Sequence, residues 1–264
     1  RPSVGLRSNF PRMSSGMLLP MRLGSRPLIK NCLTGWIYPL MVLIAKYLTN
    51  LQGKFIAHLL DHDLMSAHQS IRSHPKWPRL VELVKELAFI DGGSDDAFTL
   101  ASGRQSRWFF DTKPVMMHPE ASQLIGELLN LRMDKLGADY VGGLELGAVP
   151  LTAIAITTSP KESHRRGFMV RKEPKGRGGR KTKNPPGIEG SSLSHGGKIV
   201  IVEDVTTTGG SAIKAVERIH HDTDCTVIAV ISIVDRQEGA EAAFAAAGIP
   251  FESLMNRSDV AEPE

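Results

Sequence analysis

The stretch KIVIVEDVTTTGGS, residues 198–211, decides the fold that the rest of the sequence has to fit. Its four apolar residues at 199–202 are typical of a strand buried on both faces of a parallel sheet, which has no solvent side for polar residues. Glu203 and Asp204 follow at the carboxyl end of this strand, where open α/β sheets bind their ligands. The pattern therefore predicts an α/β protein with a ligand site at this strand end.

The residues after the two acids predict a binding site for a phosphate group. Gly209 and Gly210 let the backbone approach an anion closely, and the hydroxyls of 206–208 and Ser211 can donate hydrogen bonds. A helix that begins near Ser211 adds unpaired amides and the positive end of its dipole. Two acids repel a bare phosphate, so we expect them to accept hydrogen bonds from sugar hydroxyls or to hold a hydrated Mg²⁺. The predicted ligand is a phosphorylated sugar.

Strand and helix patterns alternate from residue 140 onward, which predicts a central parallel sheet flanked by helices, with right-handed crossovers. Upstream, 77–90 and 119–136 have apolar residues at helical spacing, and we expect the first of these helices to pack as a lid. The expected strands are 98–100, 108–111, 140–144, 168–172, 199–202, 226–234 and 251–254, and the later helices are 147–157, 211–221 and 238–247.

The interval 173–190, EPKGRGGRKTKNPPGIEG, interrupts this alternation. It is too rich in Gly, Pro and cations to build an element, so it predicts a functional or disordered loop. A solvated surface loop and a nucleic-acid-binding loop are the alternatives, but no aromatic residue is interleaved for stacking on bases. A loop that closes over a multiply charged small molecule suits the predicted phosphate site better. Its cations are Lys175, Arg177, Arg180, Lys181 and Lys183.

Residues 1–64 differ in composition from the rest, because the first sixty residues contain no Asp or Glu. A transit peptide or a signal peptide fits poorly, since no small-residue cleavage site follows the apolar run at 36–45. That run is also shorter than the about 20 residues that span a bilayer. We expect the native protein to begin near Met65, with 1–64 a non-native or poorly ordered extension and 65–264 the folded domain.

Composition narrows the remaining classes of protein. The chain has 264 residues, 41% hydrophobic residues and a net charge of +4, which is ordinary for a globular protein. Cys32 and Cys225 lie far apart without a CxxC partner, so neither a disulfide framework nor a cysteine zinc site is expected, and the compartment is predicted to be the reducing cytoplasm. His58, Asp61, His62 and Asp63 have helical spacing for a metal, but without a second ligand cluster an exposed polar helix face explains them better.

Four segments carry a resemblance to a known family: IVIVEDVTTTGGS at 199–211, DDAFTLASGRQSRWFFDTK at 95–113, FMVRKEPK with IEG at 168–190, and ISIVDRQEGA at 231–240. Together they resemble the orotate phosphoribosyltransferases, a branch of the type I phosphoribosyltransferases. The resemblance covers about residues 77–255 and implies that family's fold with a small N-terminal hood. It also implies transfer of phosphoribosyl from phosphoribosyl pyrophosphate (PRPP) to orotate, with Mg²⁺ and in a homodimer, and neither a nucleic-acid partner nor a membrane.

The resemblance assigns roles to single residues. Glu203 and Asp204 would hold the ribose hydroxyls directly or through the water shell of Mg²⁺. The implied catalytic residues are Lys175, Arg171 and Asp204. The implied PRPP-binding residues are Arg171, Lys172, Lys175, Arg177, Glu203, Asp204, Val205, Thr206, Thr207, Thr208, Gly209, Gly210 and Ser211. The implied orotate contacts are Phe109, Phe110, Thr207 and Arg236, although a core strand for the two aromatics and a surface ion pair of Arg236 with Glu238 are the structural alternatives.

The sequence departs from the family pattern at several positions. Arg177 stands where many members have a loop histidine, and a guanidinium cannot donate a proton near neutral pH. Ala101 and Gly147 stand where some members have lysines, and we expect the C-terminal helix to be short or missing. A phosphoribosyltransferase for another base, or a non-catalytic regulator that senses PRPP while binding nucleic acid, are the alternative functions, although the chain shows no helix-turn-helix pattern.

Overall fold

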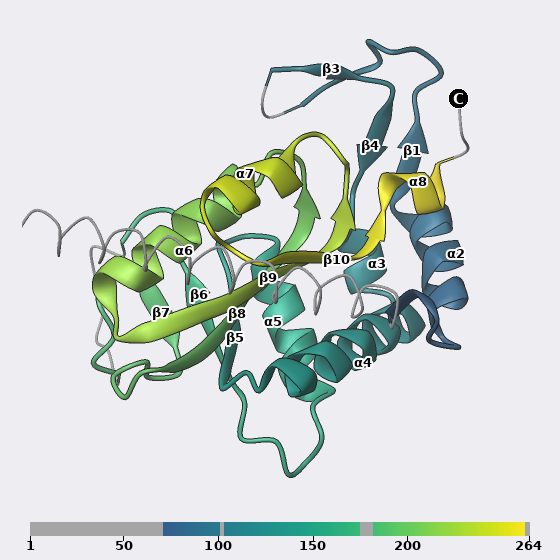
Figure 1. The fold of residues 1–264 in the computed structure, drawn as a ribbon. Helices are drawn as coiled ribbons and strands as arrows, with labels where there is room; N and C mark the ends of the chain where they lie inside the picture. The colour runs from purple at the N-terminus through teal and green to yellow at the C-terminus, as the bar shows by residue number, and fades with distance from the viewer. Residues whose placement is uncertain (1–70, 101–102, 175–181, 262–264) are drawn as a thin grey trace, which may run out of the picture. The chain divides into compact units, whose positions relative to one another are not determined.

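A six-stranded sheet with helices on both faces forms most of the folded region (Figure 1). The computed structural model describes residues 71–100, 103–174 and 182–261, all within the second of two units of the chain, Gln52–Glu264. The strand order is β10-β9-β8-β5-β6-β7, and β7 alone among these runs antiparallel to its neighbour. The strands are β5 (Tyr140–Gly142), β6 (Arg166–Val170), β7 (Ile188–Gly190), β8 (Gly197–Thr206), β9 (Cys225–Asp235) and β10 (Phe251–Asn256). The predicted α/β fold is confirmed.

β8, the strand expected from 199–202, lies in the middle of the sheet and pairs with β5 on one side and β9 on the other. Val200 and Val202 pack into one core with α4 (Pro119–Leu136) and α5 (Ala148–Thr157). Ile199 and Ile201 pack into a second core with α6 (Gly210–Asp222) and α7 (Ala240–Ala246). Both faces of the strand are therefore buried, which is why its sequence is continuously apolar.

Helix α4 spans the residues expected for it, because its ends carry recognisable signals. The backbone N–H of Ala121 donates to Nδ1 of His118 at 3.3 Å, and Pro119 occupies the first turn, where its missing N–H costs no hydrogen bond. At the other end Gly137 adopts a left-handed conformation with φ of 66°, a common helix stop.

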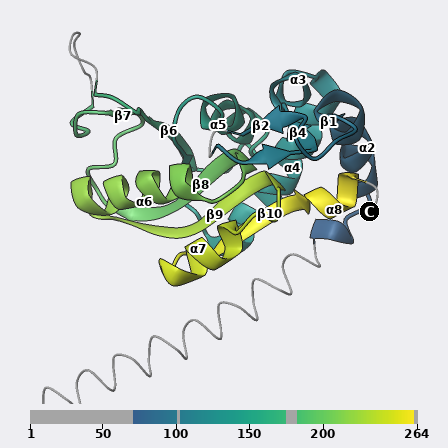
Figure 2. The ribbon, with the colours of Figure 1, turned by 90° about the horizontal axis from the view of Figure 1, so that it is seen from above.

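A smaller part of the fold, called the hood here, consists of α2 (Trp77–Leu87), β1 (Phe89–Asp91), β2 (Phe98–Thr99), β3 (Gln105–Ser106), β4 (Trp108–Phe110) and α3 (Lys113–Met116). Figure 2 shows the hood at the opposite end of the sheet from α6. The hood strands form two antiparallel pairs, β1 with β4 and β2 with β3.

The helix expected over 77–90 is too long, and this prediction is corrected. The apolar stripe of α2 ends with Leu83 and Val84, after which residues Phe89–Asp91 form β1 and pair with β4. Phe89 and Ile90 are residue types that favour strands, so pairing with β4 overrides the helical spacing. The strands expected over 98–100 and 108–111 are both present, as β2 and β4. They belong to separate pairs, because β2 pairs with β3 and β4 pairs with β1.

The loop expected over 173–190 also needs a new boundary, since its last three residues form β7 against β6 and Ile188 is buried. The last described helix is the short α8 (Arg257–Val260). The predicted extension 1–64, the start at Met65 and the histidines and aspartates at 58–63 lie outside the described residues. Ala101 does so as well.

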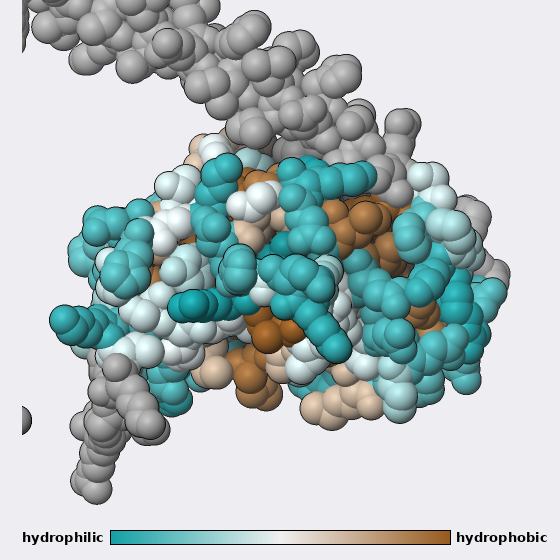
Figure 3. Space-filling model, turned by 90° about the horizontal axis from the view of Figure 1, so that it is seen from below, coloured by the Kyte–Doolittle hydropathy of each residue, from teal (hydrophilic) through white to brown (hydrophobic). Residues whose placement is uncertain are grey.

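The surface of the described part is mainly polar on the face seen in Figure 3, where hydrophobic side chains gather in separate patches. Four large hydrophobic side chains are exposed: Ile90, Phe109, Met117 and Leu146. None of the described helices is both long and apolar enough to cross a bilayer.

Candidate functional site

A pocket of about 280 Å³ lies at the carboxyl end of β8. One of the two predicted acids and the whole predicted phosphate cradle line it, together with a residue of the hood. The structure thus places half of the sequence-predicted ligand contacts, Glu203, Val205 and residues 206–211, around one pocket. The lining residues are Leu100, Glu203, Val205, Thr206, Thr207, Thr208, Gly209, Gly210, Ser211, Ala212 and Lys214.

The cradle is built where β8 ends at Thr206 and α6 begins at Gly210. Gly209 between them has φ of 79°, which L side chains rarely adopt, and a Cβ there would lie 3.0 Å from the Phe244 ring. Within the described residues no side chain caps α6. Its first amides are therefore available to an anion at the positive end of the helix dipole.

Glu203 and Asp204 project to opposite faces of β8. Glu203 lines the pocket, and its Oε2 is buried without a hydrogen-bond partner among the described residues. Burial, with the neighbouring charge of Asp204 as the second cause, raises the pKa of Glu203 to about 8, and the charge of Lys172 opposes the shift. A ligand that donates hydrogen bonds or carries positive charge would stabilise the ionised form of this side chain.

Asp204 lies against the turn that leads into α5. Its Oδ2 accepts a hydrogen bond from Oγ1 of Thr112 at 3.2 Å. A Cβ at Gly147 would lie only 2.3 Å from the carboxylate, so a side chain has no room at this position. The close approach gives a physical reason for the small residue at 147.

The structure separates the two predicted orotate aromatics. Phe110 is 5% exposed in the core and lies 5.2 Å from the Phe89 ring, so the core-strand alternative holds for it. Phe109 is 37% exposed on the opposite face of β4, with its ring 5.6 Å from that of Phe98. Neighbouring residues of a strand point to opposite faces, so when Phe110 points into the core Phe109 has to point away from it. Phe109 alone of the pair is accessible to a ligand.

Arg236 is buried between the sheet and the hood instead of at the surface. Its Nη2 donates to Oγ of Ser106 and to the carbonyl oxygen of Trp108, both at 2.9 Å. The same nitrogen lies 2.8 Å from Oε1 of Glu238, and both partners of this ion pair are nearly inaccessible. The expected pairing with Glu238 exists, but the pair is internal, and Arg236 joins the sheet to the hood segment that contains β3 and β4.

Arg171 and Lys172, the two cations that precede the predicted loop, lie at the end of β6, and Lys183, the described cation of the loop itself, is exposed. Nε of Arg171 donates to the carbonyl oxygen of Glu173 at 3.2 Å, and its Nη1 lies 3.6 Å from Oε1 of Glu189. The backbone N–H of Lys172 donates to Oε1 of Glu145 at 2.9 Å. Lys175 and Arg177 lie outside the described residues.

Three residues that contact the pocket or hold one of the two acids were not predicted from the sequence. Lys214 lines the pocket one turn into α6, four residues after Gly210, and the helical spacing of i and i+4 is the signal that could have found it. Leu100 reaches the pocket from the hood, and Thr112 holds Asp204 from the start of α3. Neither of these two has a local sequence signal, because both contacts depend on how the hood folds over the sheet.

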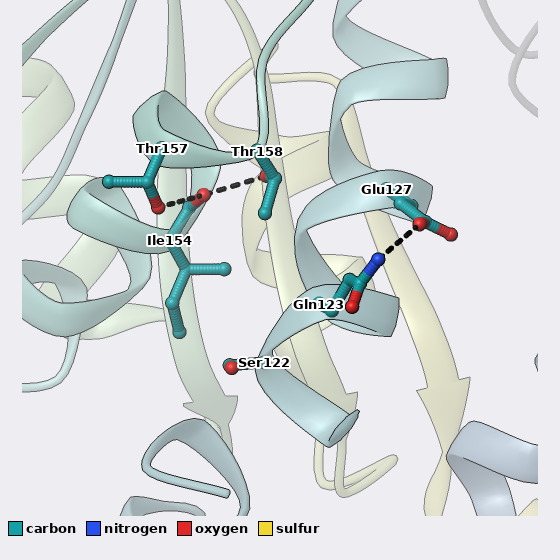
Figure 4. Close-up of a pocket in the computed structure, with 6 residues that line it drawn as sticks. All are labelled: Ser122, Gln123, Glu127, Ile154, Thr157 and Thr158. Carbon is teal, nitrogen blue, oxygen red and sulfur yellow. Dashed lines mark hydrogen bonds between the residues drawn. The ribbon is translucent and has the colours of Figure 1, made fainter. Parts of the chain in front are cut away.

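A larger surface pocket, of about 380 Å³, lies between α4 and α5 (Figure 4). Its polar groups are engaged with one another: Nε2 of Gln123 donates to Glu127, and Oγ1 of Thr158 donates to the carbonyl oxygen of Ile154. No lining group here resembles the unpaired acid and amides at the end of β8. The smaller pocket is the better candidate for chemistry.

The acidic residues at the end of β8 are the candidate ligands for a metal ion. Across the described ranges no group of three or more His, Cys, Asp and Glu side chains could hold an ion. Glu203, whose Oε2 is without a partner among the described residues, nevertheless suits Mg²⁺, which commonly takes one or two protein carboxylates and completes its shell with water and substrate phosphates.

Comparison with known proteins identifies the family. No protein-family model matches the chain. An orotate phosphoribosyltransferase of Rhodopseudomonas palustris strain TIE-1 is 48% identical over 185 residues, which are 69% of this chain and 94% of that protein. A Mycobacterium tuberculosis H37Rv orotate phosphoribosyltransferase in complex with Fe(III) dicitrate superposes with a TM-score of 0.60 at 34% identity, covering 71% of this chain and 99% of the other. The same enzyme in complex with PRPP gives a TM-score of 0.56 at 32% identity, over 70% and 99%. The chain belongs to the orotate phosphoribosyltransferase family.

Proposed function

We propose that this protein transfers the phosphoribosyl group of PRPP to orotate, giving orotidine 5′-monophosphate and pyrophosphate, in the de novo synthesis of UMP. The observation that carries the proposal is the pocket at the end of β8, where a buried acid and an uncapped helix N-terminus face the same space. A ribose with a 5′-phosphate complements both features. Family membership supplies the second support.

The substrates are arranged along this pocket in the proposal. The 5′-phosphate takes the amides and hydroxyls of 207–211, and the ribose hydroxyls face Glu203 and Asp204. Orotate lies toward the hood, near Thr207 and the accessible ring of Phe109. Phe110 packs in the core and so holds β4, the strand that carries Phe109. Arg236 acts on the base site by holding the hood segment of β3 and β4 in place.

The reaction needs no protein nucleophile. As the bond to pyrophosphate breaks, positive charge grows on the anomeric carbon and negative charge on the leaving group. The ring nitrogen of orotate then bonds to that carbon, and its proton passes to water or to the departing pyrophosphate. Arg171, Lys172 and Lys175 lower the energy of the leaving group by neutralising its charge, with Arg177 adding a further cation. Asp204 and Glu203 hold the sugar so that carbon, leaving group and base stay in line.

Mg²⁺ is part of the proposal, held by Glu203 and Asp204 together with substrate oxygens and water. When bound, it supplies positive charge to the pyrophosphate and ribose oxygens. We further propose a cytoplasmic homodimer, in which the basic loop of one subunit reaches the partner's site. The homodimer is proposed because the basic loop of this chain resembles the loop of the orotate phosphoribosyltransferases.

The decisive experiment follows the absorbance of orotate when PRPP and Mg²⁺ are added to the protein. A fall in absorbance that depends on all three is expected, and a folded sample without any change would overturn the proposal. Adenine, guanine and uracil in place of orotate test the other-base alternative. PRPP binding without turnover of any base would favour the regulatory alternative, which predicts tight and salt-dependent binding of nucleic acid.

The basic loop is tested with Lys175→Ala. If its charge stabilises the departing pyrophosphate, turnover falls by about 100-fold or more. Lys198→Ala is the control, since Lys198 lies at the far end of β8 from the pocket. Equal turnover in the two variants would contradict the role of Lys175.

A further inference from the structure

Ser232 is a polar residue in an otherwise apolar part of β9. Its side chain is fully buried, as are those of Val230, Ile231, Ile233 and Val234 around it. Its Oγ has no hydrogen-bond partner within the part of the chain that the structure describes. A buried hydroxyl without a partner destabilises a fold, so an apolar residue would suit this position better if only packing mattered.

The strand register places Ser232 directly beside Glu203. The two residues are paired across the parallel strands β8 and β9, and Ser253 of β10 is the next residue in the same row. Paired residues of neighbouring strands, which lie about 4.8 Å apart, project to the same face of the sheet. Ile201 and Val230, two residues earlier on each strand, pack in the core with α6, so the row lies on that face.

Two complementary atoms in this row lack partners. Oε2 of Glu203 is a buried acceptor without a donor, and the hydroxyl of Ser232 is a buried donor without an acceptor, as far as the described residues go. Ser253 differs, because its hydroxyl donates to Oδ1 of Asn256 at 2.8 Å. Because the two side chains stand on the same face of neighbouring strands about 4.8 Å apart, the hydroxyl of Ser232 is the nearest candidate donor on β9 for Oε2 of Glu203.

We propose that Ser232 is a positioning residue for the ribose site: its hydroxyl donates to Oε2 of Glu203 when PRPP engages the other oxygen of that carboxylate. The inference rests on the proposed function, since it needs PRPP to bind at Glu203. Ser232 itself does not touch the substrate. Its hydroxyl orients the carboxylate and replaces part of the hydration that burial removes.

The test measures PRPP binding by calorimetry in the presence of Mg²⁺, using the full chain with Ser232→Ala and Ser232→Cys. Alanine removes the donor, and cysteine keeps a side chain of similar shape with only a weak donor. The Kd for PRPP is expected to rise about tenfold in both, as for the loss of one hydrogen bond to a charged group. The KM for orotate should stay within about twofold, because the row lies under the ribose site.

Thermal unfolding without ligand separates positioning from a structural role. Removal of an unsatisfied hydroxyl should leave the Tm of Ser232→Ala equal to that of the wild type or higher. A structural role predicts the opposite, a lower Tm with unchanged affinity.

Ser253→Ala is the matched control, a buried serine in the same row that is not adjacent to Glu203. Its Kd for PRPP should remain within about twofold of the wild type. An unchanged Kd in Ser232→Ala and Ser232→Cys, with normal binding by the wild type, would overturn this inference alone. Absence of PRPP binding by the wild-type chain would overturn the proposed function as well.

Discussion

Nη2 of Arg236, just after β9, donates a 2.9 Å hydrogen bond to the carbonyl oxygen of Trp108 in the hood. The same nitrogen contacts Ser106 and Glu238, so one guanidinium joins the sheet, the hood segment of β3 and β4, and the segment before α7. Its burial makes these contacts difficult to replace, since water cannot reach the groups that would be left behind.

Arg236→Ala is therefore expected to lower the free energy of unfolding by about 3 kcal/mol, because it leaves Glu238 with only the more distant Arg104, at 3.7 Å, and leaves two groups of the hood without their donor. Urea unfolding measures the change. Arg79→Ala is the control: Arg79 also pairs with two carboxylates, but on the exposed surface, and its removal should matter little. Equal stability of Arg236→Ala and the wild type would show that the hood does not depend on this contact.

The two aromatic residues of β4 should behave oppositely on truncation. Phe110→Ala creates a cavity in the core and should cost about 3–4 kcal/mol of stability. Phe109→Ala removes a half-exposed ring and should change stability far less, while raising the KM for orotate several-fold. Denaturation curves and steady-state kinetics on both variants test this. A Phe109→Ala enzyme with the wild-type KM would remove Phe109 from the base site.

Glu203 should give the ligand-free protein a characteristic pH dependence. Its pKa is raised in the folded state to about 8 from the ordinary value of 4.5, so between these values the folded state holds more of this proton than the unfolded state. Stability is then fully present below about pH 4.5 and falls as the pH rises toward 8, by at most about 1.4 kcal/mol per pH unit.

Glu203→Gln should remove the contribution of this side chain to the change of stability with pH. The variant should therefore be more stable than the wild type at pH 8, although it binds PRPP poorly. Unfolding measured from pH 5 to 8 without ligand compares the two proteins. Parallel pH profiles for variant and wild type would contradict the burial of an ionisable group here.

Gly209→Ala tests the geometry of the cradle. The new Cβ has to adopt a left-handed conformation, at about 1–2 kcal/mol, and also meets the Phe244 ring at 3.0 Å. Both stability and PRPP affinity should fall. Gly248→Ala is the control, because Gly248 has φ of 67° with no atom within 4 Å of its added Cβ. If Gly248→Ala reduced PRPP affinity equally, the effect would not come from the cradle.

The sequence predicted best what local patterns determine. β8 and α4 were found because burial on two faces and helix-end residues leave signals within a few positions, and the contiguous cradle after β8 was found in the same way. The end of α2 was missed because β1 exists only through its pairing with β4.

The site was predicted incompletely for a similar reason. Phe109 and Phe110 were assigned one role, although a strand directs neighbouring side chains to opposite faces. Arg236 was expected at the base or on the surface, and its burial depends on a hood segment more than a hundred residues earlier in the chain. Leu100 and Thr112 reach the pocket from that same hood, which no periodicity connects to β8.

The position of β8 between β5 and β9 has a consequence for local opening of the protein. Both edges of this strand are hydrogen-bonded, so its amides exchange only when most of the sheet separates, whereas the short strand pairs of the hood can open at a smaller free energy. The proposed phosphate end of the site therefore adjoins the part of the fold that opens least. The proposed base end belongs to the more easily opened part, where ligands would enter and leave without disturbing the cradle.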